Sequence, residues 1–580
     1  MQQYDSTKSR RSRDRYGLSA LLAYFSFSIF FFGRSLIGRF STAIIGQGCD
    51  PGAYVWCLVW LPYAFHHHLN PLFSDLIWAP GESLAWRTFM PLLSLFAWPI
   101  TAAFGPVAAF NVSCLLAPAL AGWTAFILCR YITGRSWPAF AGGYVFGFSP
   151  YIAAQMTGHL VLVAVWPIPL AVYLAIRRVN GDIGPSGFTI LLALLVAAQF
   201  LMELELAATL AFFGGLAILA AVPLAPADVR RRLYIAILNS GVAAVLAATL
   251  LSPYLYYMLA FPVESGPPWP PDIFSADLLN FVIPTPANLV GGFQVFRTIS
   301  SRFPGNLGET SAYLSPGLII IAIAFAFTHW REWTGRLLIA MLAFFCILSM
   351  GNLLHIGGVA KFPLPWNLFL YLPLIDKALP VRLTMFTFLI LAIMTAVWLS
   401  AAPVRSAVRP AIAILAVLLM LPNLKADFWV NRLNLPSFLA AGHERKYLRE
   451  NDVVLPLPKH PYGDGMLWQA VSGMYFRIAE GYLGPDPQGF EQWQAGDPWQ
   501  FLEFLAKHNV TAIIISDKRW HEVWAEGPVS WKLAQADRKK SLTEFYQSVL
   551  KVDPIKLDDA FIFKVPPDLL APYREALARP

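Results

Sequence analysis

Long hydrophobic runs, separated by short polar segments, dominate the chain up to about residue 423. Eleven of them have the length and composition of membrane-spanning helices. A shorter run at 89–104 is punctuated by Pro91 and Pro99, so we expect it to lie in the interface or to re-enter. The pattern predicts a polytopic α-helical membrane protein with spans near residues 17–38, 107–129, 137–153, 160–176, 187–202, 206–224, 233–253, 313–329, 337–351, 383–402 and 409–423.

The basic residues between the runs predict which segments share a side of the membrane. Lys and Arg are enriched in cytoplasmic loops. With the run at 89–104 not crossing, the basic N-terminus and the clusters at 130–135, 177–178, 230–232, 331–336 and 405–409 all fall on one side, which we interpret as the cytoplasm. The large segments 39–106, 254–312 and 352–381, and everything after 423, then face the outside.

The tail has a different pattern. Residues 452–458, 511–516 and 560–565 are predicted strands, and 498–508 and 538–552 are predicted amphipathic helices between them. We therefore expect a membrane domain over 1–423 and an extracytoplasmic α/β domain over 424–580. The tail has no Gly-rich phosphate loop, HExxH or GxSxG motif, which favours a recognition or capping module over a catalytic one.

Composition agrees with the membrane class. Hydrophobic residues make up 57% of the chain and charged residues 13%, and the mean hydropathy is +0.53. The formal charge of +8 comes from clusters between apolar runs, so nucleic acid is excluded as a partner. The five cysteines include no CxxC pair, and the adjacent His66, His67 and His68 point different ways on a helix. The sequence therefore assigns no disulfide framework and no metal site.

Asp50 lies in GQGCDPGAYVWCLVW (46–60), at a Gly/Pro-rich corner ahead of an aromatic-rich segment. One interpretation is that it caps a helix beginning near Pro51. Capping explains the Asp-Pro pair but not the aromatic residues, which could form an interfacial belt. The other interpretation is catalytic.

A first span, a large outer loop with an acid near its start, further spans with ordered outer loops and a C-terminal outer domain together resemble the GT-C glycosyltransferases. Within that superfamily, PLLSLFAWPITAAFGPVAAFNVSCLLAPALAGWTAFILCRYITGRSWPAFAGGYVFGFSPYIAAQMTGHL (91–160) is similar to family 39-type enzymes and YfhO-like bacterial proteins. The resemblance implies an integral glycosyltransferase of the bacterial inner membrane. It would transfer a hexosyl or pentosyl group from a polyprenyl-phosphate donor to an envelope lipid, glycan or protein, with inversion.

The resemblance also implies site residues. Asp50 matches the catalytic acid of the first loop, and an acceptor hydroxyl needs such a carboxylate to take its proton. The family often has a second acid beside it, whereas here the neighbours are Cys49 and Pro51. Asp75 and Glu82 are candidate partners from the same loop, and a divalent cation, Mg²⁺ or Mn²⁺, is left open as a cofactor.

The lipid phosphate requires positive charge on the outer side. Arg382 and Lys377 precede a span there, and a guanidinium can bind two phosphate oxygens, although a snorkelling arginine would look the same. His159 and Glu309 are candidate substrate contacts at the outer ends of spans, with structural roles as the alternative. Glu203 and Glu205 lie in a predicted outer turn, where they would line a polar cavity or reach the surface.

Two other classes of function remain open. A catalytically silent envelope scaffold would keep this fold, and the missing acidic neighbour of Asp50 favours that alternative. A lipid or glycan transporter would also be hydrophobic, but it should show half-to-half symmetry and ionisable residues at mid-membrane, which the sequence does not show clearly.

Overall fold

The computed structural model describes residues 6–263, 266–401, 407–484, 497–516 and 535–578. Its contacts divide the chain into two compact units. Unit 1 contains residues 1–38, 111–253 and 265–430, and unit 2 contains residues 39–110, 254–264 and 431–580. The predicted C-terminal domain is thus joined in unit 2 by most of the first predicted outer loop.

Unit 1 is built mainly of helices. Each of the eleven predicted spans overlaps at least one of these helices. The third predicted span, 137–153, overlaps both α5 and α6, which are separated by Phe148 and Ser149. The helices are α1 (Ser6–Ser28), continued by the π-helical turn η1 (Ile29–Gly33) and by η2 (Arg34–Leu36), α4 (Pro106–Thr133, whose first turn belongs to unit 2), α5 (Ser136–Gly147), α6 (Pro150–Gln155), α7 (Leu160–Val163), α8 (Pro167–Asn180), α9 (Pro185–Phe200), α10 (Leu204–Leu224), α11 (Ala227–Leu250), α14 (Pro316–His329), α15 (Trp333–Ser349), α16 (Thr384–Ser400) and α17 (Val408–Leu419).

Six helical segments of the described chain are long and apolar enough to cross a membrane: Tyr16–Leu36, Pro106–Thr133, Leu160–Asn180, Leu204–Leu224, Ala227–Leu250 and Pro380–Ser400. Shorter apolar helices add to them. The segment that contains α16 is 89% buried within the protein, whereas the one in α11 is 22% buried. Since α11 exposes most of its apolar side chains, its surroundings must be apolar too, as in a bilayer. The polytopic helical class is confirmed.

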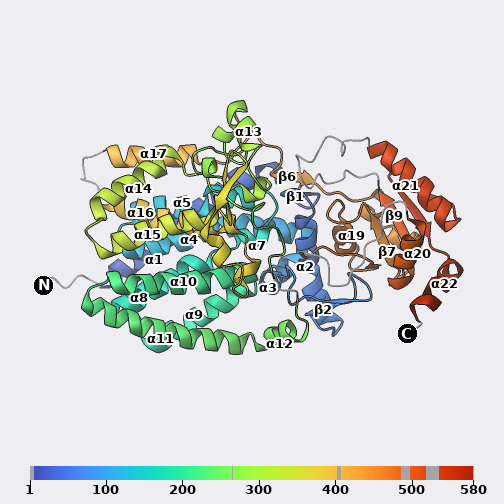
Figure 1. Ribbon diagram of the computed structural model, residues 1–580, viewed down its shortest axis with the longest axis horizontal. Coiled ribbons are helices and arrows are strands. Elements are labelled where there is room, and N and C mark those ends of the chain that lie inside the picture. Colours follow the sequence, from blue (N-terminus) through green and yellow to red (C-terminus); the bar gives the residue numbers. More distant parts are fainter. Residues whose placement is uncertain (1–5, 264–265, 402–406, 485–496, 517–534, 579–580) are drawn as a thin grey trace. The chain divides into compact units, whose positions relative to one another are not determined.

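Close helix packing fixes the middle of unit 1. A Cβ atom on Gly143 of α5 would lie 2.2 Å from the Tyr24 hydroxyl oxygen and 2.5 Å from the Gly122 carbonyl oxygen of α4. The same tyrosine hydroxyl donates to the Phe140 carbonyl at 2.7 Å. Small residues allow this approach, as is typical of helices that pack in membranes. On another side, α8, α9, α10 and α11 pack against one another (Figure 1).

Short elements fill the segments between the spans of unit 1. The hairpin β4–β5 is held at its turn by the Asp277 carboxylate, which accepts the Gly357 N–H at 3.0 Å and the Gly358 N–H at 2.7 Å. Asp277 thus joins two of the predicted outer segments, 254–312 and 352–381. The elements are η3 (Leu278–Phe281), η4 (Val290–Gly292), α13 (Gln294–Ser300), η5 (Leu307–Glu309), β4 (Leu353–Ile356), β5 (Val359–Pro363), η6 (Pro365–Leu368), η7 (Ile375–Lys377) and η8 (Pro380–Leu383).

Unit 2 contains a five-stranded sheet in the order β10-β11-β9-β7-β8. Strand β7 pairs in parallel with β8 and β9, whereas β9–β11 and β11–β10 are antiparallel. The three predicted strands are confirmed as β7 (Val453–Leu457), β9 (Ala512–Ser516) and β11 (Ala560–Lys564), and the others are β8 (Arg477–Ile478) and β10 (Ile555–Lys556). Their runs were readable because β7 and β9 are buried on both faces.

Two of the helices that accompany this sheet, α20 and α21, correspond to the predicted helices at 498–508 and 538–552. Phe501 and Leu505 of α20, Tyr546 of α21 and Leu570 of α22 share one apolar core with strand residues such as Ile513. Figure 1 shows α20 and α22 beside the strands. The helices of this part are α18 (Ser437–Ala440), η9 (Glu444–Lys446), α19 (Gly465–Val471), α20 (Pro498–Lys507), α21 (Gln535–Leu550) and α22 (Pro567–Leu577). The α/β class of the tail is confirmed.

Most of the remaining part of unit 2 comes from the first predicted outer loop. Its chain extends the sheet, since the Ile478 N–H donates to the Leu76 carbonyl at 2.9 Å and the Trp78 N–H to the Glu480 carbonyl at 3.0 Å. The run at 89–104 forms the 14-residue helix α3. The elements are β1 (Ala43–Ile45), α2 (Asp50–His66), β2 (Phe73–Ser74), β3 (Glu82–Ser83), α3 (Pro91–Phe104), α12 (Ser252–Ala260, which begins in unit 1) and β6 (Val430–Arg432), the partner of β1.

Candidate functional site

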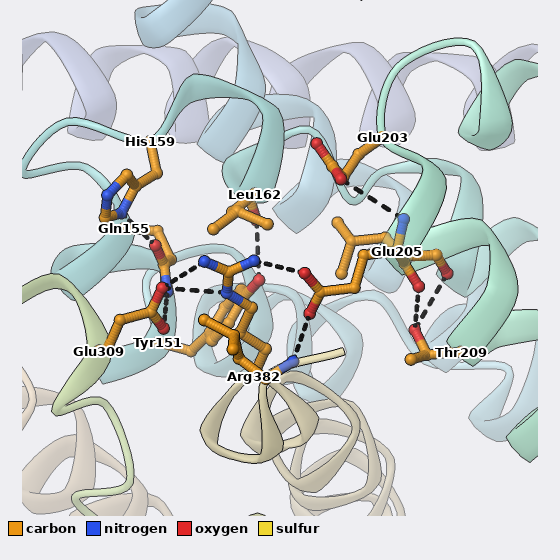
Figure 2. A network of polar contacts seen from close by, with 11 residues as sticks. Tyr151, Gln155, His159, Leu162, Glu203, Glu205, Thr209, Glu309 and Arg382 are labelled. Atoms are coloured by element: carbon orange, nitrogen blue, oxygen red, sulfur yellow. Dashed lines mark hydrogen bonds and ion pairs between the residues drawn. The ribbon is translucent and has the colours of Figure 1, made fainter. Parts of the chain in front are cut away.

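Arg382 is the centre of a buried ionic network in unit 1 (Figure 2). Its Nε and Nη2 atoms both donate to Oε1 of Glu309, the Nε bond at 2.9 Å, and its Nη1 atom is paired with Glu205 on the other side. The side chains of Arg382, Glu205 and Glu309 are only 18%, 10% and 2% exposed. The guanidinium is thus bound by a carboxylate on each side.

Three separate parts of the chain position these charges. Glu205 lies in the first turn of α10, and its second oxygen accepts the Leu379 N–H at 3.1 Å, just before η8 places Arg382. Glu309 ends η5, whose start is capped by the Asn306 side chain through the Glu309 N–H at 3.1 Å. A backbone N–H therefore binds the Glu205 carboxylate, whereas the Asn306 cap fixes the backbone of Glu309.

Gln155, the last residue of α6, and His159, the residue before α7, extend the network. The Gln155 amide nitrogen donates to Oε2 of Glu309 at 3.3 Å, and its amide oxygen lies 2.7 Å from Nδ1 of His159. A Cβ atom on Gly308 would lie 2.7 Å from the imidazole, so the residue before Glu309 has no room for a side chain. Four of the predicted site residues, namely His159, Glu205, Glu309 and Arg382, are thus brought together.

The network carries excess negative charge. Burial works to raise the pKa of Glu309, but Arg382, with help from His159 and Gln155, outweighs it and lowers that pKa. Burial and the neighbouring Glu205 raise the pKa of Glu203, which caps α10, to about 7. The printed bonds to Glu205 and Glu309 use three of the five guanidinium N–H groups of Arg382, so an incoming phosphate would either bind beside the carboxylates or replace one of them. The assignment of Arg382 to the donor phosphate stays a prediction.

Lys377 has other contacts. Its Nζ atom donates to the Gly266 carbonyl and lies 3.6 Å from Oδ2 of Asp376, which also accepts the Gly266 N–H at 3.0 Å. Lys377 and Asp376 thus hold the chain at Gly266, and a role in phosphate binding stays a prediction.

Asp50 lies at the start of α2, in unit 2. The helix begins at Asp50 itself and its N-cap is Cys49, so the expectation that Asp50 caps a helix starting at Pro51 is wrong by one residue. The Asp50 carboxylate, burial and Cys49 together raise the pKa of the Tyr482 hydroxyl. The side chain of Asp464 also approaches this turn, because a Cβ atom on Gly52 would lie 3.2 Å from its Oδ1 atom.

The other acids of the first loop are paired with arginines. Asp75 lies 2.9 Å from Arg477, and Glu82 lies 2.9 Å from Arg87. Their assignment as partners of Asp50 or as substrate contacts stays a prediction.

Several residues of both clusters had not been identified from the sequence. Gln155 ends α6 and His159 lies beyond the turn that follows, so no shared helical face relates the two residues in sequence. Tyr151, whose hydroxyl donates to the Leu162 carbonyl at 3.0 Å, lies beside the ionic network but resembles any core tyrosine in sequence. Asp464 and Tyr482 are more than 400 residues from Asp50 in sequence, and no local pattern relates them to it.

A divalent metal was left open as a cofactor. Within the described ranges, no group of three or more His, Cys, Asp and Glu residues is arranged to hold a metal ion. Of the three adjacent histidines, His67 is bonded to the Tyr63 carbonyl at 2.9 Å and its ring stacks on that of Tyr63. Mg²⁺ or Mn²⁺ as a cofactor stays an expectation from the resemblance.

Solved structures with a similar fold are membrane glycosyltransferases of the GT-C type. ArnT from Cupriavidus metallidurans in the apo state matches with a TM-score of 0.53 and 12% identity, covering 97% of this chain and 99% of that one. Arabinofuranosyltransferase AftD from Mycobacteria matches with a TM-score of 0.51 and 15% identity, covering 87% of this chain and 37% of that one. ArnT bound to undecaprenyl phosphate has a TM-score of 0.47 at 10% identity, covering 95% of this chain and 98% of that one.

These similarities establish a GT-C fold, as the resemblance in sequence had implied. No curated protein matches the chain. The family DUF6311, described as a domain of unknown function, matches residues 20–422. Because that match spans more than half of the chain, the protein belongs to the DUF6311 family.

Proposed function

We propose that this protein is an integral membrane glycosyltransferase. It would transfer a sugar from a polyprenyl-phosphate donor to an envelope lipid, glycan or protein on the outer face of a bacterial inner membrane. The fold supports this class of enzyme, since one neighbour is by its title an arabinofuranosyltransferase. The observation that carries the proposal is the position of Asp50 in the first turn of the otherwise largely buried helix α2, among polar side chains.

In the proposed reaction the Asp50 carboxylate accepts the proton of an acceptor hydroxyl. The acceptor oxygen forms a bond to the anomeric carbon while the bond from that carbon to the phosphate oxygen breaks. The polyprenyl phosphate leaves with the electron pair, and the configuration at the anomeric carbon is inverted. General base catalysis of this kind contributes roughly 10²- to 10⁴-fold to a rate.

Arg382 and Lys377 are proposed to hold the donor phosphate. For Arg382 the phosphate oxygens would bind N–H groups that the two carboxylates do not use, or exchange with one of the carboxylates. Arginine suits that exchange because carboxylate and phosphate offer it similar paired oxygens. The proposed substrate contacts are His159, Glu203, Glu205, Glu309, Asp75 and Glu82.

The test is turnover of undecaprenyl-phosphate-linked hexoses and pentoses by the purified protein, measured as release of undecaprenyl phosphate. Asp50→Asn should lower the rate at least about 100-fold while leaving undecaprenyl phosphate binding in place. The matched control is Asp497→Asn, since Asp497 caps α20 through the Trp499 and Gln500 N–H groups and thus reports the cost of losing an acid at a helix start. Equal turnover by wild type and Asp50→Asn would refute the role of Asp50. Binding without turnover of any donor would instead favour a silent scaffold.

The side of the membrane is tested separately. Single cysteines at positions 50 and 500, in a background without the native cysteines, should react with an impermeant maleimide added to intact cells from outside. Labelling of both only after permeabilisation would invert the proposed topology and remove the glycosyltransferase proposal.

A further inference from the structure

Gln155 connects Glu309 to His159 within the buried network of unit 1 (Figure 2). The His159 N–H donates to the Gln155 carbonyl at 2.8 Å, and this bond closes the turn between α6 and α7. It brings the two side chains together, with the Gln155 amide oxygen 2.7 Å from Nδ1 of His159. Gln155 is fully buried, so its amide has to find its hydrogen-bond partners within the protein.

The charges fix the direction of each hydrogen bond in this series. Glu309 accepts two N–H bonds from the Arg382 guanidinium, the Nε bond at 2.9 Å, so its carboxylate is ionised. An ionised carboxylate can only accept, which means that the Gln155 group 3.3 Å from its Oε2 atom is the NH₂ end of the amide. The oxygen end then faces His159, and this oxygen also can only accept. Nδ1 of His159 therefore carries a proton.

The ring of His159 is also held from the side of η5. A Cβ atom on Gly308 would lie 2.7 Å from Cε1 of the ring and 3.0 Å from Nδ1, so the backbone of η5 covers this edge. The Asn306 side chain fixes that backbone by accepting the Glu309 N–H at 3.1 Å. His159 is partly exposed, whereas Gln155 and Glu309 are buried. The imidazole is thus the accessible end of this series.

The position of the proton decides which groups His159 can bind. A neutral histidine with its proton on Nδ1 has an acceptor at Nε2, so any group hydrogen-bonded to Nε2 in that state must donate. A sugar hydroxyl can donate. The phosphodiester of a polyprenyl-phosphate sugar has no O–H group and can only accept. This tautomer therefore favours the sugar of the proposed donor over its phosphate.

We propose that Gln155 is a positioning residue that keeps the proton on Nδ1 of His159, so that Nε2 accepts a hydrogen bond from a hydroxyl of the donor sugar. This inference rests on the proposed function and deepens it. It assigns the two ends of the network to different parts of the donor, with His159 at the sugar and Arg382 at the phosphate.

The tautomer can be measured without turnover, by NMR of protein labelled with ¹⁵N in its histidine rings and reconstituted in nanodiscs. The signals of His159 are those that disappear in His159→Asn. At pH 8 the wild type should have a protonated Nδ1 and an unprotonated Nε2. Gln155→Leu should move both signals toward the average of the two tautomers, whereas Gln155→Glu, which retains an accepting oxygen, should keep Nδ1 protonated.

The matched control is Gln199→Leu. Gln199 is buried to the same extent as Gln155, and its amide nitrogen donates to the Ala164 carbonyl at 3.4 Å. This variant should leave the His159 signals unchanged. An unprotonated Nδ1 in the wild type, or identical His159 signals in the wild type and Gln155→Leu, would overturn the inference.

A binding assay tests the sugar contact. Of the undecaprenyl-phosphate-linked hexoses and pentoses, the wild type should bind at least one more tightly than undecaprenyl phosphate itself. Gln155→Leu and His159→Phe should each weaken binding of that glycosylated carrier about 3- to 10-fold, as expected for one hydrogen bond, and change binding of undecaprenyl phosphate less than about twofold. Gln199→Leu should change neither affinity. Equal affinity of the wild type for the free and all glycosylated carriers, or equal losses for both carriers in His159→Phe, would contradict the sugar contact.

The outcomes separate this inference from the proposed function. Loss of turnover in Asp50→Asn, together with an unprotonated Nδ1 in wild-type His159, leaves the proposed function standing and removes only the role of Gln155. Absence of turnover with every donor, together with the expected tautomer and the expected difference between the two carriers, removes glycosyl transfer and keeps His159 as a sugar-binding residue.

Discussion

Replacing Arg382 with methionine is expected to destabilise unit 1 strongly and in a pH-dependent way. The substitution keeps an unbranched side chain but leaves Glu205 and Glu309, which are 10% and 2% exposed, without their counter-charge. At about 4 Å between charge centres and an effective dielectric constant near 20, each lost pair is worth about 4 kcal/mol. Breaking buried pairs in this way costs about 3–5 kcal/mol.

Protonation limits that cost and gives the pH dependence. A carboxyl with an ordinary pKa near 4.3 can be protonated at pH 7 for roughly 4 kcal/mol and at pH 5 for roughly 1 kcal/mol. In the wild type the pKa of Glu309 is lowered. The ionised carboxylate therefore contributes to stability at pH values above its ordinary pKa, and this contribution is lost as the pH falls through the lowered pKa. The difference between variant and wild type should therefore shrink as the pH falls from 7 to 5.

The assay is thermal unfolding of the purified protein in detergent at both pH values. Arg382→Met should lower Tm by up to about 10 °C at pH 7 and by much less at pH 5, and adding Glu205→Gln and Glu309→Gln should restore most of the loss. The control is Arg232→Met, because Arg232 and Asp228 form an exposed pair at 3.0 Å that should be worth less than about 1 kcal/mol. Similar shifts in the two arginine variants, or a shift independent of pH, would refute the reasoning.

Three further predictions concern other parts of the protein. Gly143→Ala should cost about 1–3 kcal/mol or prevent expression, because its Cβ atom meets a tyrosine hydroxyl at 2.2 Å, whereas Gly184→Ala, with nothing within 4 Å, should be tolerated in the same melting assay. Burial and Glu205 raise the pKa of Glu203 to about 7, so its ionisation opposes folding. Glu203→Gln should therefore gain stability relative to the wild type as the pH rises from about 5 to 8, and identical pH profiles of Tm for the two proteins would contradict this. Trp56→Phe should speed proteolysis of the C-terminal domain by removing the indole bond to a buried glutamine, whereas Trp499→Phe, at a ring 64% exposed, should not.

The sequence predicted the fold well wherever a pattern was local. The spans follow from apolar runs, and the three central strands follow from runs such as TAIIIS, because strands buried on both faces contain few polar residues. The compact units could not be predicted. Residues 39–110 pair with residues 431–580 through backbone hydrogen bonds such as the one from Trp78 to Glu480, and such pairing leaves no trace in the composition of either segment.

The candidate site shows the same difference between features that a local pattern predicts and contacts that depend on the fold. Arg382 and Glu309 were identifiable because charges next to apolar runs are conspicuous. The sequence could not show that they pair with each other, which depends on how three separate loops fold. Asp464 was missed because a buried acid in a mixed α/β domain has many structural explanations, and only its approach to Gly52 of α2 distinguishes it.

The most direct test of glycosyl transfer by Asp50 is the anomeric configuration of the product, determined by NMR after reaction of an undecaprenyl-phosphate sugar of known anomer. The account predicts a product of inverted configuration that wild type forms and Asp50→Asn does not. A product of retained configuration, or one formed equally well by both proteins, would contradict direct displacement with Asp50 as the base.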